Sequence, residues 1–433
     1  MSIDSQIARL QALEILDSRG NPTLSVTVTL TDGNSATASV PSGASTGLHE
    51  AVELRDDDRN RYGGKGVRRA AAHVEGEIAD ALMGLDARAQ SDIDHVMIAL
   101  DGTDTKGRLG GNAILGVSIA VARASALAQG RPLYRSLNDA DDYLLPVPCM
   151  NVLNGGKHAD SSLDFQEFMI VPHGAPGFAE AVRYGAETYA ALRSLLHDRG
   201  LATSVGDEGG FAPRLDSNEA ACELIVAAIE RAGYRPGVDI AIALDPAASS
   251  FAEGESYHLS RSRTRRLDRA ALLALYGRWI DAYPIVSIED GFGEEDWAGF
   301  IDQTADQGDR IQIVGDDLFV TNPRIIREGI ARHAANAALI KPNQIGTVTE
   351  TIEAVRICQQ AGWGTMVSHR SGETADDFIA DFAVAMGAGQ IKSGAPCRGE
   401  RLAKYNRLIA IEAELGDRAR MAAPFARYVE RRA

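Results

Sequence analysis

Six short apolar runs between residues 240 and 396 decide the fold of this chain: IAIALD (240–245), IVSIED (285–290), IQIVGDD (311–317), AALIKPN (337–343), GTMVSHR (364–370) and GQIKSGAP (389–396). Their near-continuous apolar character is typical of strands buried on both faces of a parallel sheet. The segments between them, such as WAGFIDQTADQ (297–307), place apolar residues three and four positions apart, which predicts helices. Strands that alternate with helices predict a parallel sheet, and six consecutive units predict a β/α barrel.

Each of the six runs ends on polar side chains. The C-terminal ends of the strands form the active-site mouth of such a barrel. A single charged residue at a strand end often only forms a turn or stays solvated. Reactive groups at six consecutive strand ends are too regular a pattern to be explained by turns and solvated charges. We therefore expect one mouth to gather Asp245, Glu289, Asp316, Lys341, His369, Arg370 and Lys392.

The barrel is expected to begin irregularly. PVPCMNVLNGG (146–156) and DFQEFMIVP (164–172) are strand-like, and the segments 177–199 and 217–232 after them have helical periodicity. The order is strand, strand, helix, helix, followed by six strand–helix units, which gives eight strands. A hairpin is expected around SYHLSRSR (256–263), and helices after residue 398 close the barrel.

A smaller α+β domain is predicted before the barrel. ARLQALEILD (8–17), PTLSVTVTL (22–30) and SATASVP (35–41) alternate with turn residues and predict an antiparallel meander. Apolar residues in the segments 66–84 and 111–129 recur at the spacing typical of amphipathic helices. The predicted fold class is α/β, with an N-terminal α+β domain at 1–137 and an eight-stranded β/α barrel at 138–433.

Composition excludes several classes of function. The 433 residues carry a net charge of −16 without a long basic tract, which argues against nucleic acid as a partner. Four cysteines without a CxxC pair do not form a disulfide framework, so we expect a reducing, cytoplasmic setting. No signal peptide is evident, and the apolar run 114–128 is interrupted by Arg123 and is too short to span a membrane.

The carboxylates at three successive strand ends suit a hard divalent cation. Asp245, Glu289 and Asp316 offer only oxygen ligands, and Mg²⁺ prefers these and keeps other positions for water and substrate. The alternative is that they cap the helices that follow. Lys341, on the next strand, can act as a general base if neighbouring cations lower its pKa, and a bound metal and Lys392 are candidates for that role.

Further polar residues lie in the connecting loops. Glu208 in VGDEGG and Glu167 in FQEF form a carboxyl pair that can share a proton, so one of them is a candidate general acid. Arg370 and Ser371 suit phosphate. His158 can donate to a phosphate or leaving group, or be structural. The loop SGASTGLHE (42–50) is either a plain surface linker or a lid that excludes water.

These motifs together resemble the enolase family, the 2-phosphoglycerate dehydratases of glycolysis. A lysine base with bound Mg²⁺ is the arrangement known for enolase-superfamily sites. The match extends from residue 17 to about residue 415, and its motifs keep the order of the family: DSRGNPT, VPSGASTG, LGGNAILGVS, NVLNGG, QEFMIVP, VGDEGGFAP, ALD, SIED, GDDLFVTNP, IKPNQIGT, SHRSGET and QIKSGAP with ERLAKYN.

The resemblance implies two Mg²⁺ ions per active site. One would be held by Asp245, Glu289 and Asp316, and the other would enter with substrate and bind Ser45, in a loop that then acts as a lid. Lys341 would take the C2 proton, and Glu208 with Glu167 would help to expel the C3 hydroxyl. The residues implied to hold the substrate are Gln166, His158, His369, Arg370, Ser371 and Lys392.

The resemblance also implies a homodimer, with octamers known in the family, and a cytoplasmic location, although some members are also found at the cell surface. The sequence departs from the family at Pro246, Ser250 and Gly399. Pro246 directly follows a predicted metal ligand, which leaves open a paralogue that dehydrates a related phosphorylated or phosphono hydroxy acid. A protein used mainly for binding is a third hypothesis, but the intact set of reactive residues argues against it.

Overall fold

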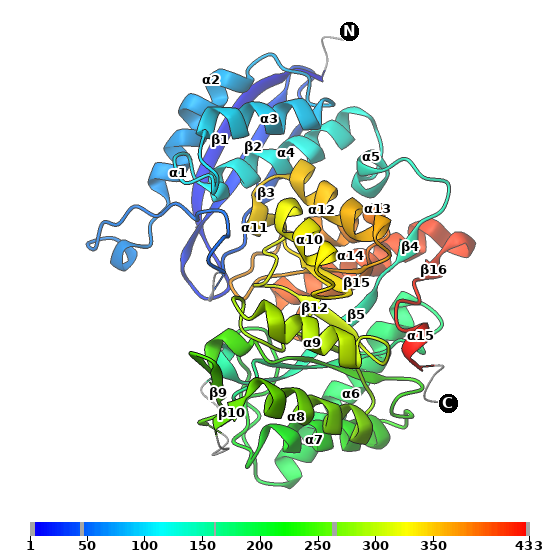
Figure 1. Ribbon diagram of the computed structural model, residues 1–433. Helices are drawn as coiled ribbons and strands as arrows, with labels where there is room; N and C mark the ends of the chain where they lie inside the picture. The colour runs from blue at the N-terminus through cyan, green and yellow to red at the C-terminus, as the bar shows by residue number, and fades with distance from the viewer. Residues whose placement is uncertain (1–4, 44–46, 160–161, 262–265, 430–433) are drawn as a thin grey trace.

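The computed structural model describes residues 5–43, 47–159, 162–261 and 266–429. An N-terminal sheet with its helices lies above a barrel in Figure 1. The sheet has the order β1-β2-β3 and is antiparallel, as predicted, with strands β1 (Ile7–Leu16), β2 (Pro22–Leu30) and β3 (Ser35–Ser39).

Helices cover one face of this sheet. The predicted helix at 66–84 is present as α1 (Arg68–His73), a π-helical turn (Val74–Ile78) and α2 (Ala79–Leu82), with non-helical dihedrals at Gly76. Sequence analysis did not predict α3 (Gln90–Asp101), which begins without a side-chain cap. A short helix, α5 (Leu133–Leu137), precedes the barrel.

Helix α4 (Gly111–Ala128) forms the core of the N-terminal part. Among the described helices it is the one with the length and hydropathy to cross a membrane, so the prediction that this run is too short was wrong on that measure. Of its residues, 83% are buried. It packs against β2 and β3, and we therefore interpret it as a core helix.

Eight strands close into a barrel in the order β11-β12-β13-β14-β15-β5-β6-β7. The apolar residues of these strands are buried on both faces, as predicted. The strands are β5 (Val147–Asn154), β6 (Glu167–Val171), β7 (Ala241–Asp245), β11 (Ile285–Glu289), β12 (Gln312–Gly315), β13 (Ala337–Ile340), β14 (Gly364–Ser368) and β15 (Gly389–Lys392).

One strand of the barrel is not parallel to its neighbours. β6 runs antiparallel to both β5 and β7. The six strands of the predicted strand–helix units are parallel to one another, as expected, so the exception lies in the irregular start of the barrel. The reason is the connection: the described residues between β5 and β6 form only one short 3₁₀ turn (Gly156–His158), whereas a parallel pair needs a crossover, usually an α-helix. The chain then returns through the helix pair α6 (Phe178–Asp198) and α7 (Asn218–Arg231).

Helices surround the remaining strands in the predicted alternation. Polar side chains cap several of them, such as Ser217 on α7 and Thr347 on α12. Residues 262 and 263 of the expected hairpin at 256–263 lie outside the described residues. Its first part forms β9 (Ser256–His258), which lies in a small sheet between β8 (Ala252–Glu253) and β10 (Arg266–Asp268). The outer helices are α8 (Arg269–Ala282), α9 (Trp297–Gln307), α10 (Pro323–Ala331), α12 (Val348–Gln360), α13 (Phe378–Met386) and α14 (Gly399–Leu415). Two short helices are α11 (Pro342–Ile345) and α15 (Ala426–Val429). The short strands β4 (Leu144–Leu145) and β16 (Arg420–Met421) pair with each other outside the barrel.

The N-terminal part docks on the mouth of the barrel. Ser42 and Gly372 exchange two backbone hydrogen bonds, and Arg123 of α4 pairs with Asp376. These contacts bring the segment before residue 50 to the C-terminal ends of the barrel strands, where the predicted reactive residues lie.

Candidate active site

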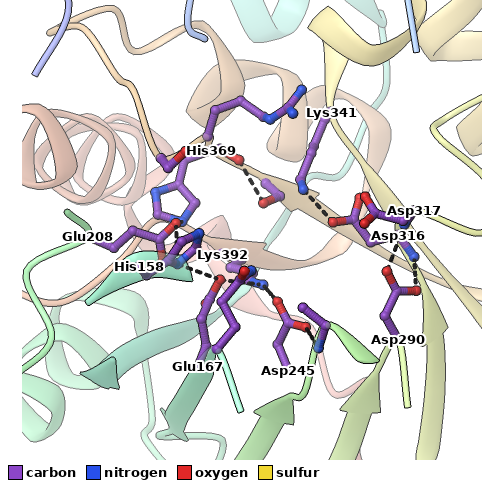
Figure 2. Close-up of a pocket in the computed structure, with 15 residues that line it drawn as sticks. His158, Glu167, Glu208, Asp245, Asp290, Asp316, Asp317, Lys341, His369 and Lys392 are labelled. Carbon is purple, nitrogen blue, oxygen red and sulfur yellow. Dashed lines mark hydrogen bonds and ion pairs between the residues drawn. The ribbon is translucent and has the colours of Figure 1, made fainter. Parts of the chain in front are cut away.

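A cavity lies at the C-terminal ends of the barrel strands (Figure 2). It gathers the predicted site residues with two exceptions: Glu289 is buried behind Lys392, and Ser45 lies outside the described residues. Sequence analysis missed Asp290 and Asp317, although each directly follows a predicted ligand. The residues that line the cavity are His158, Gln166, Glu167, Glu208, Asp245, Ala247, Asp290, Asp316, Asp317, Lys341, Ser368, His369, Arg370, Ser371 and Lys392.

One side of the cavity, here called the lysine side, is lined by Asp245, Asp290, Asp316, Asp317, Lys341 and Lys392, and it includes Glu289, which is buried behind Lys392. The Lys392 ammonium lies 2.9 Å from Glu289 Oε1 and 3.0 Å from Asp245 Oδ2. It also lies 3.1 Å from Glu167 Oε1, because the antiparallel pairing of β6 with β7 places Glu167 directly opposite Asp245.

Lys341 forms an ion pair with a predicted metal ligand. Its Nζ atom lies 2.5 Å from Asp316 Oδ2, and the other oxygen of Asp316 accepts a hydrogen bond from Gln344. Burial lowers the pKa of Lys341, but the negative charges of Asp316 and Glu289 together outweigh it and hold the pKa above its ordinary value. This direction is opposite to the lowered pKa expected for a general base, which would need added positive charge beside these carboxylates.

The lysine side carries more carboxylates than its two ammonium groups can balance. Burial and the neighbouring Asp245 raise the pKa of Glu289 well above its ordinary value. Burial and Asp316 raise the pKa of Asp317 to about 7. Such shifts indicate missing positive charge, and the donors are carboxylate oxygens, so this side fits a hard divalent cation.

The predicted ligand set is held differently in this structure. Among the described residues, Asp290, Asp316 and Asp317 bring carboxylate oxygens within 4.8 Å of one another. The oxygens of Asp290 accept the backbone N–H groups of the other two residues, at 2.8 Å each. Between Asp245 and Glu289 lies the Lys392 ammonium instead.

The opposite side of the cavity, here called the histidine side, contains His158, Glu167, Glu208 and His369 (Figure 2). We include with it Gln166, which lines the cavity and precedes Glu167 in the chain. Glu208 Oε1 lies 3.5 Å from both His158 Nδ1 and His369 Nε2. Burial raises the pKa of Glu208, but the two histidines outweigh it and hold the pKa well below its usual range. Burial and Glu208 raise the pKa of Glu167 well above its usual range. The pair thus divides into an ionised Glu208 and a protonated Glu167.

Several polar atoms on the histidine side lack a hydrogen bond to any described residue. Buried polar atoms are normally paired, and an unpaired one costs free energy. These atoms belong to residues that line the cavity, so they are available to a ligand. They are Gln166 Oε1, Glu167 Oε2, His158 Nδ1 and His369 Nε2.

Arg370 completes the cavity between the two sides. Its guanidinium donates to both oxygens of Glu50, at 2.9 and 3.2 Å, and to Asn343 Oδ1 at 3.1 Å. Glu50 also accepts from the backbone N–H of Gly47. The loop that sequence analysis singled out is therefore tied to a predicted phosphate-binding residue.

The departures from the family motifs leave these contacts in place. Pro246 lies between Asp245 and Ala247, whose backbone N–H donates to Asp245 Oδ1 at 2.9 Å. A Cβ added to Gly399 meets no atom within 4 Å, so this glycine does not shape the site. Ser250 ends a short 3₁₀ turn and does not line the cavity.

Comparison with known proteins agrees with this geometry. The family model for the enolase C-terminal TIM barrel domain matches residues 142–428, and that for the enolase N-terminal domain matches residues 7–137. The chain belongs to the enolase family. Enolase 1 of Methylococcus capsulatus is 62% identical over 416 residues, which cover 96% of this chain and 99% of that protein. Enolase 2 of Pseudomonas syringae pv. syringae (58% identical, covering 96% and 97%) and the enolase of Desulfotalea psychrophila (58%, covering 95% and 98%) are also similar.

Proposed function

We propose that this protein catalyses the reversible, Mg²⁺-dependent dehydration of 2-phosphoglycerate to phosphoenolpyruvate. One observation carries the proposal: Lys341 faces Glu208 and Glu167 across a single cavity (Figure 2). This arrangement suits the removal of a proton from one face of a substrate and of a hydroxyl from the other. Membership of the enolase family supports the same reaction.

The lysine side of the cavity would remove the proton. Lys341 would accept the C2 proton of the substrate through Nζ once its pairing with Asp316 is relieved. Asp245, Glu289 and Asp316 would hold one Mg²⁺, and Ser45 would bind a second that enters with the substrate. The bound metal supplies positive charge that stabilises the enolate and lowers the pKa of Lys341.

The histidine side would remove the hydroxyl. Glu167 is the protonated member of the carboxyl pair, so it can hold the proton that the leaving hydroxyl needs, with Glu208 beside it. His158 and His369 would donate to Glu208 or to the substrate. Arg370 and Ser371 would bind the phosphate, and Gln166 and Lys392 would orient the carboxylate end of the substrate.

The assembly and location of the protein are also proposals. We propose a homodimer in the cytoplasm. Leu13 and Leu16 of β1 are exposed apolar side chains, which a second chain could cover. The four cysteines are free thiols, which suits a reducing compartment. Light scattering should give twice the 46.2 kDa of one chain, and a monomer would contradict the dimer.

The test is the ultraviolet absorbance of a 2-phosphoglycerate solution mixed with the purified protein. We expect a rise from the new conjugated double bond when Mg²⁺ is present, its loss with chelator, and its return with added Mg²⁺. A flat trace from protein that is folded by circular dichroism would contradict the proposal and favour a related substrate.

A further inference from the structure

Arg401 is a buried residue that reaches the active site from behind. It lies in α14, its side chain is 0% exposed, and it does not line the cavity. Its Nη1 atom lies 2.5 Å from His369 Nδ1 and 2.5 Å from the carbonyl oxygen of Arg370. Its Nη2 atom donates to the carbonyl oxygens of Ser371, at 2.7 Å, and Asp207, at 3.1 Å. The four N–H groups of the two terminal nitrogens therefore have four acceptors.

The contact with His369 fixes the chemistry of the imidazole. A guanidinium has five N–H donors and no acceptor, and it keeps its charge in proteins. His369 Nδ1 must therefore accept the hydrogen bond, so it carries no proton. The imidazole is then neutral, and its single proton is on Nε2.

The surroundings of His369 oppose any second proton. Burial, together with the charges of Arg401 and Lys392, lowers the pKa of His369 to about 3, although Glu208 acts in the opposite direction. His369 also donates its backbone N–H to the carbonyl oxygen of Lys392, which holds its position at the end of β14.

The proton on Nε2 points toward the reaction space. Nε2 lies 3.5 Å from Glu208 Oε1, is buried, and has no hydrogen bond of good geometry to any described residue. A ligand oxygen or the Glu208 carboxylate can accept from it. With Nδ1 blocked by Arg401 and Nε2 already protonated, the ring has no free lone pair to take up a proton.

We propose that Arg401 is a positioning residue that locks His369 in the neutral form protonated at Nε2, so that His369 serves as a fixed hydrogen-bond donor to Glu208 and the substrate and not as a proton carrier. This inference rests on the proposed dehydration, because it assigns a role in that reaction. The proton of the leaving hydroxyl then has to come from the carboxyl pair of Glu167 and Glu208.

A purely structural role for Arg401 is the alternative, because a buried guanidinium that bonds three backbone carbonyls also stabilises the fold. The two roles differ in their effect on the ring of His369. Two-bond ¹⁵N–¹H correlation spectra of the full chain with labelled histidine report the protonation of each ring nitrogen. The His369 signals are assigned by their loss in a His369→Gln variant.

In the wild-type spectrum at neutral pH we expect a protonated Nε2 and an unprotonated Nδ1 for His369, unchanged down to pH 5. In Arg401→Met we expect a mixture of the two tautomers, and in Arg401→Lys a partial return to the Nε2 form. The matched control is Arg407→Met, which removes another arginine of α14 that pairs with Asp381 and Glu414 away from the cavity. It should leave the His369 signals unchanged.

A wild-type ring protonated at Nδ1 or at both nitrogens would overturn the inference, and so would an unchanged tautomer in folded Arg401→Met. The wild-type spectrum decides the matter even if Arg401→Met does not fold. If the spectrum is as expected but 2-phosphoglycerate is not dehydrated, the proposed function is contradicted, but the inference that Arg401 fixes the tautomer of His369 is still supported.

Kinetics give a second, independent readout. A glutamine amide reaches the place of Nε2, whereas an asparagine amide reaches only the place of Nδ1. We expect His369→Asn to lose about 100-fold in kcat and His369→Gln to lose about tenfold at most, since a donor to a charged group is retained. The dependence of kcat on pH at the acid end should be the same in His369→Gln as in the wild type, because His369 does not carry a proton in the reaction. A loss of this dependence, or an asparagine variant as active as the glutamine variant, would contradict the proposal.

Discussion

The two sides of the cavity neutralise their buried polar groups in different ways. On the lysine side, carboxylates pair with ammonium groups and still lack positive charge. On the histidine side, one carboxyl is protonated, two imidazoles face the other, and several atoms have no partner among the described residues. Under the proposed function, the lysine side binds a cation and handles the C2 proton, while the histidine side handles the leaving hydroxyl.

The most severe way to break this division is Lys341→Met. Removing a general base costs up to about 10⁴-fold in rate, so we expect a loss of that size in kcat for 2-phosphoglycerate. Exchange of the C2 proton with solvent, followed by NMR in D₂O, should be lost as well. Exchange at the wild-type rate would show that Lys341 is not the base.

Glu208→Gln tests the other side. Its kcat should fall about 10³-fold, because the carboxylate that both histidines face is lost. The exchange of the C2 proton should continue, since Lys341 and its neighbours are unchanged. The division between the two sides would be contradicted if this variant lost exchange and dehydration to the same extent.

Lys392→Met sharpens the comparison through stability. Lys392 is buried and lies within 3.1 Å of Glu167, Asp245 and Glu289. Leaving buried carboxylates without their partner should lower the free energy of unfolding by about 3 kcal/mol in chelator. Urea denaturation measures this loss, which Mg²⁺ should partly restore. The control is Arg183→Met, which breaks an exposed pair on α6 and should change stability by less than about 1 kcal/mol.

The smallest expected effect is the contribution of His369 to the pH dependence of the free energy of unfolding. The pKa of His369 is about 3 in the folded protein and 6.5 for an ordinary histidine. At a pH between these two values the unfolded chain therefore binds a proton at this histidine, whereas the folded protein does not. This histidine therefore contributes stability that is complete above pH 6.5 and is lost as the pH falls toward 3. Between pH 7 and 5 the wild type should lose on the order of 2 kcal/mol more than His369→Gln in urea titrations. Equal losses would contradict the lowered pKa.

The same division explains what the sequence could predict. The lysine side comes from regular strand–helix units, so periodicity alone placed Asp245, Glu289, Asp316 and Lys341 at one mouth. Glu167, Glu208 and His158 come from the irregular start of the barrel, where the antiparallel β6 has no signal in periodicity. Their roles needed family motifs as well as chemistry. Asp290 and Asp317 were missed because sequence analysis assigned one ligand to each strand end and chose the residue before each of them. Arg401 was missed because its contacts are with residues that are distant in the sequence.

The position of Arg401 in the chain has a consequence for biosynthesis. The residues that face the substrate are all translated by residue 392, but the guanidinium that orders three of them lies in a helix made afterwards. A ribosome that stalls before α14 would release a chain with every substrate-facing group and without the part that holds His369 in place. Proteolytic trimming or premature termination that removes α14 should therefore lower turnover, although every residue that lines the cavity is still present.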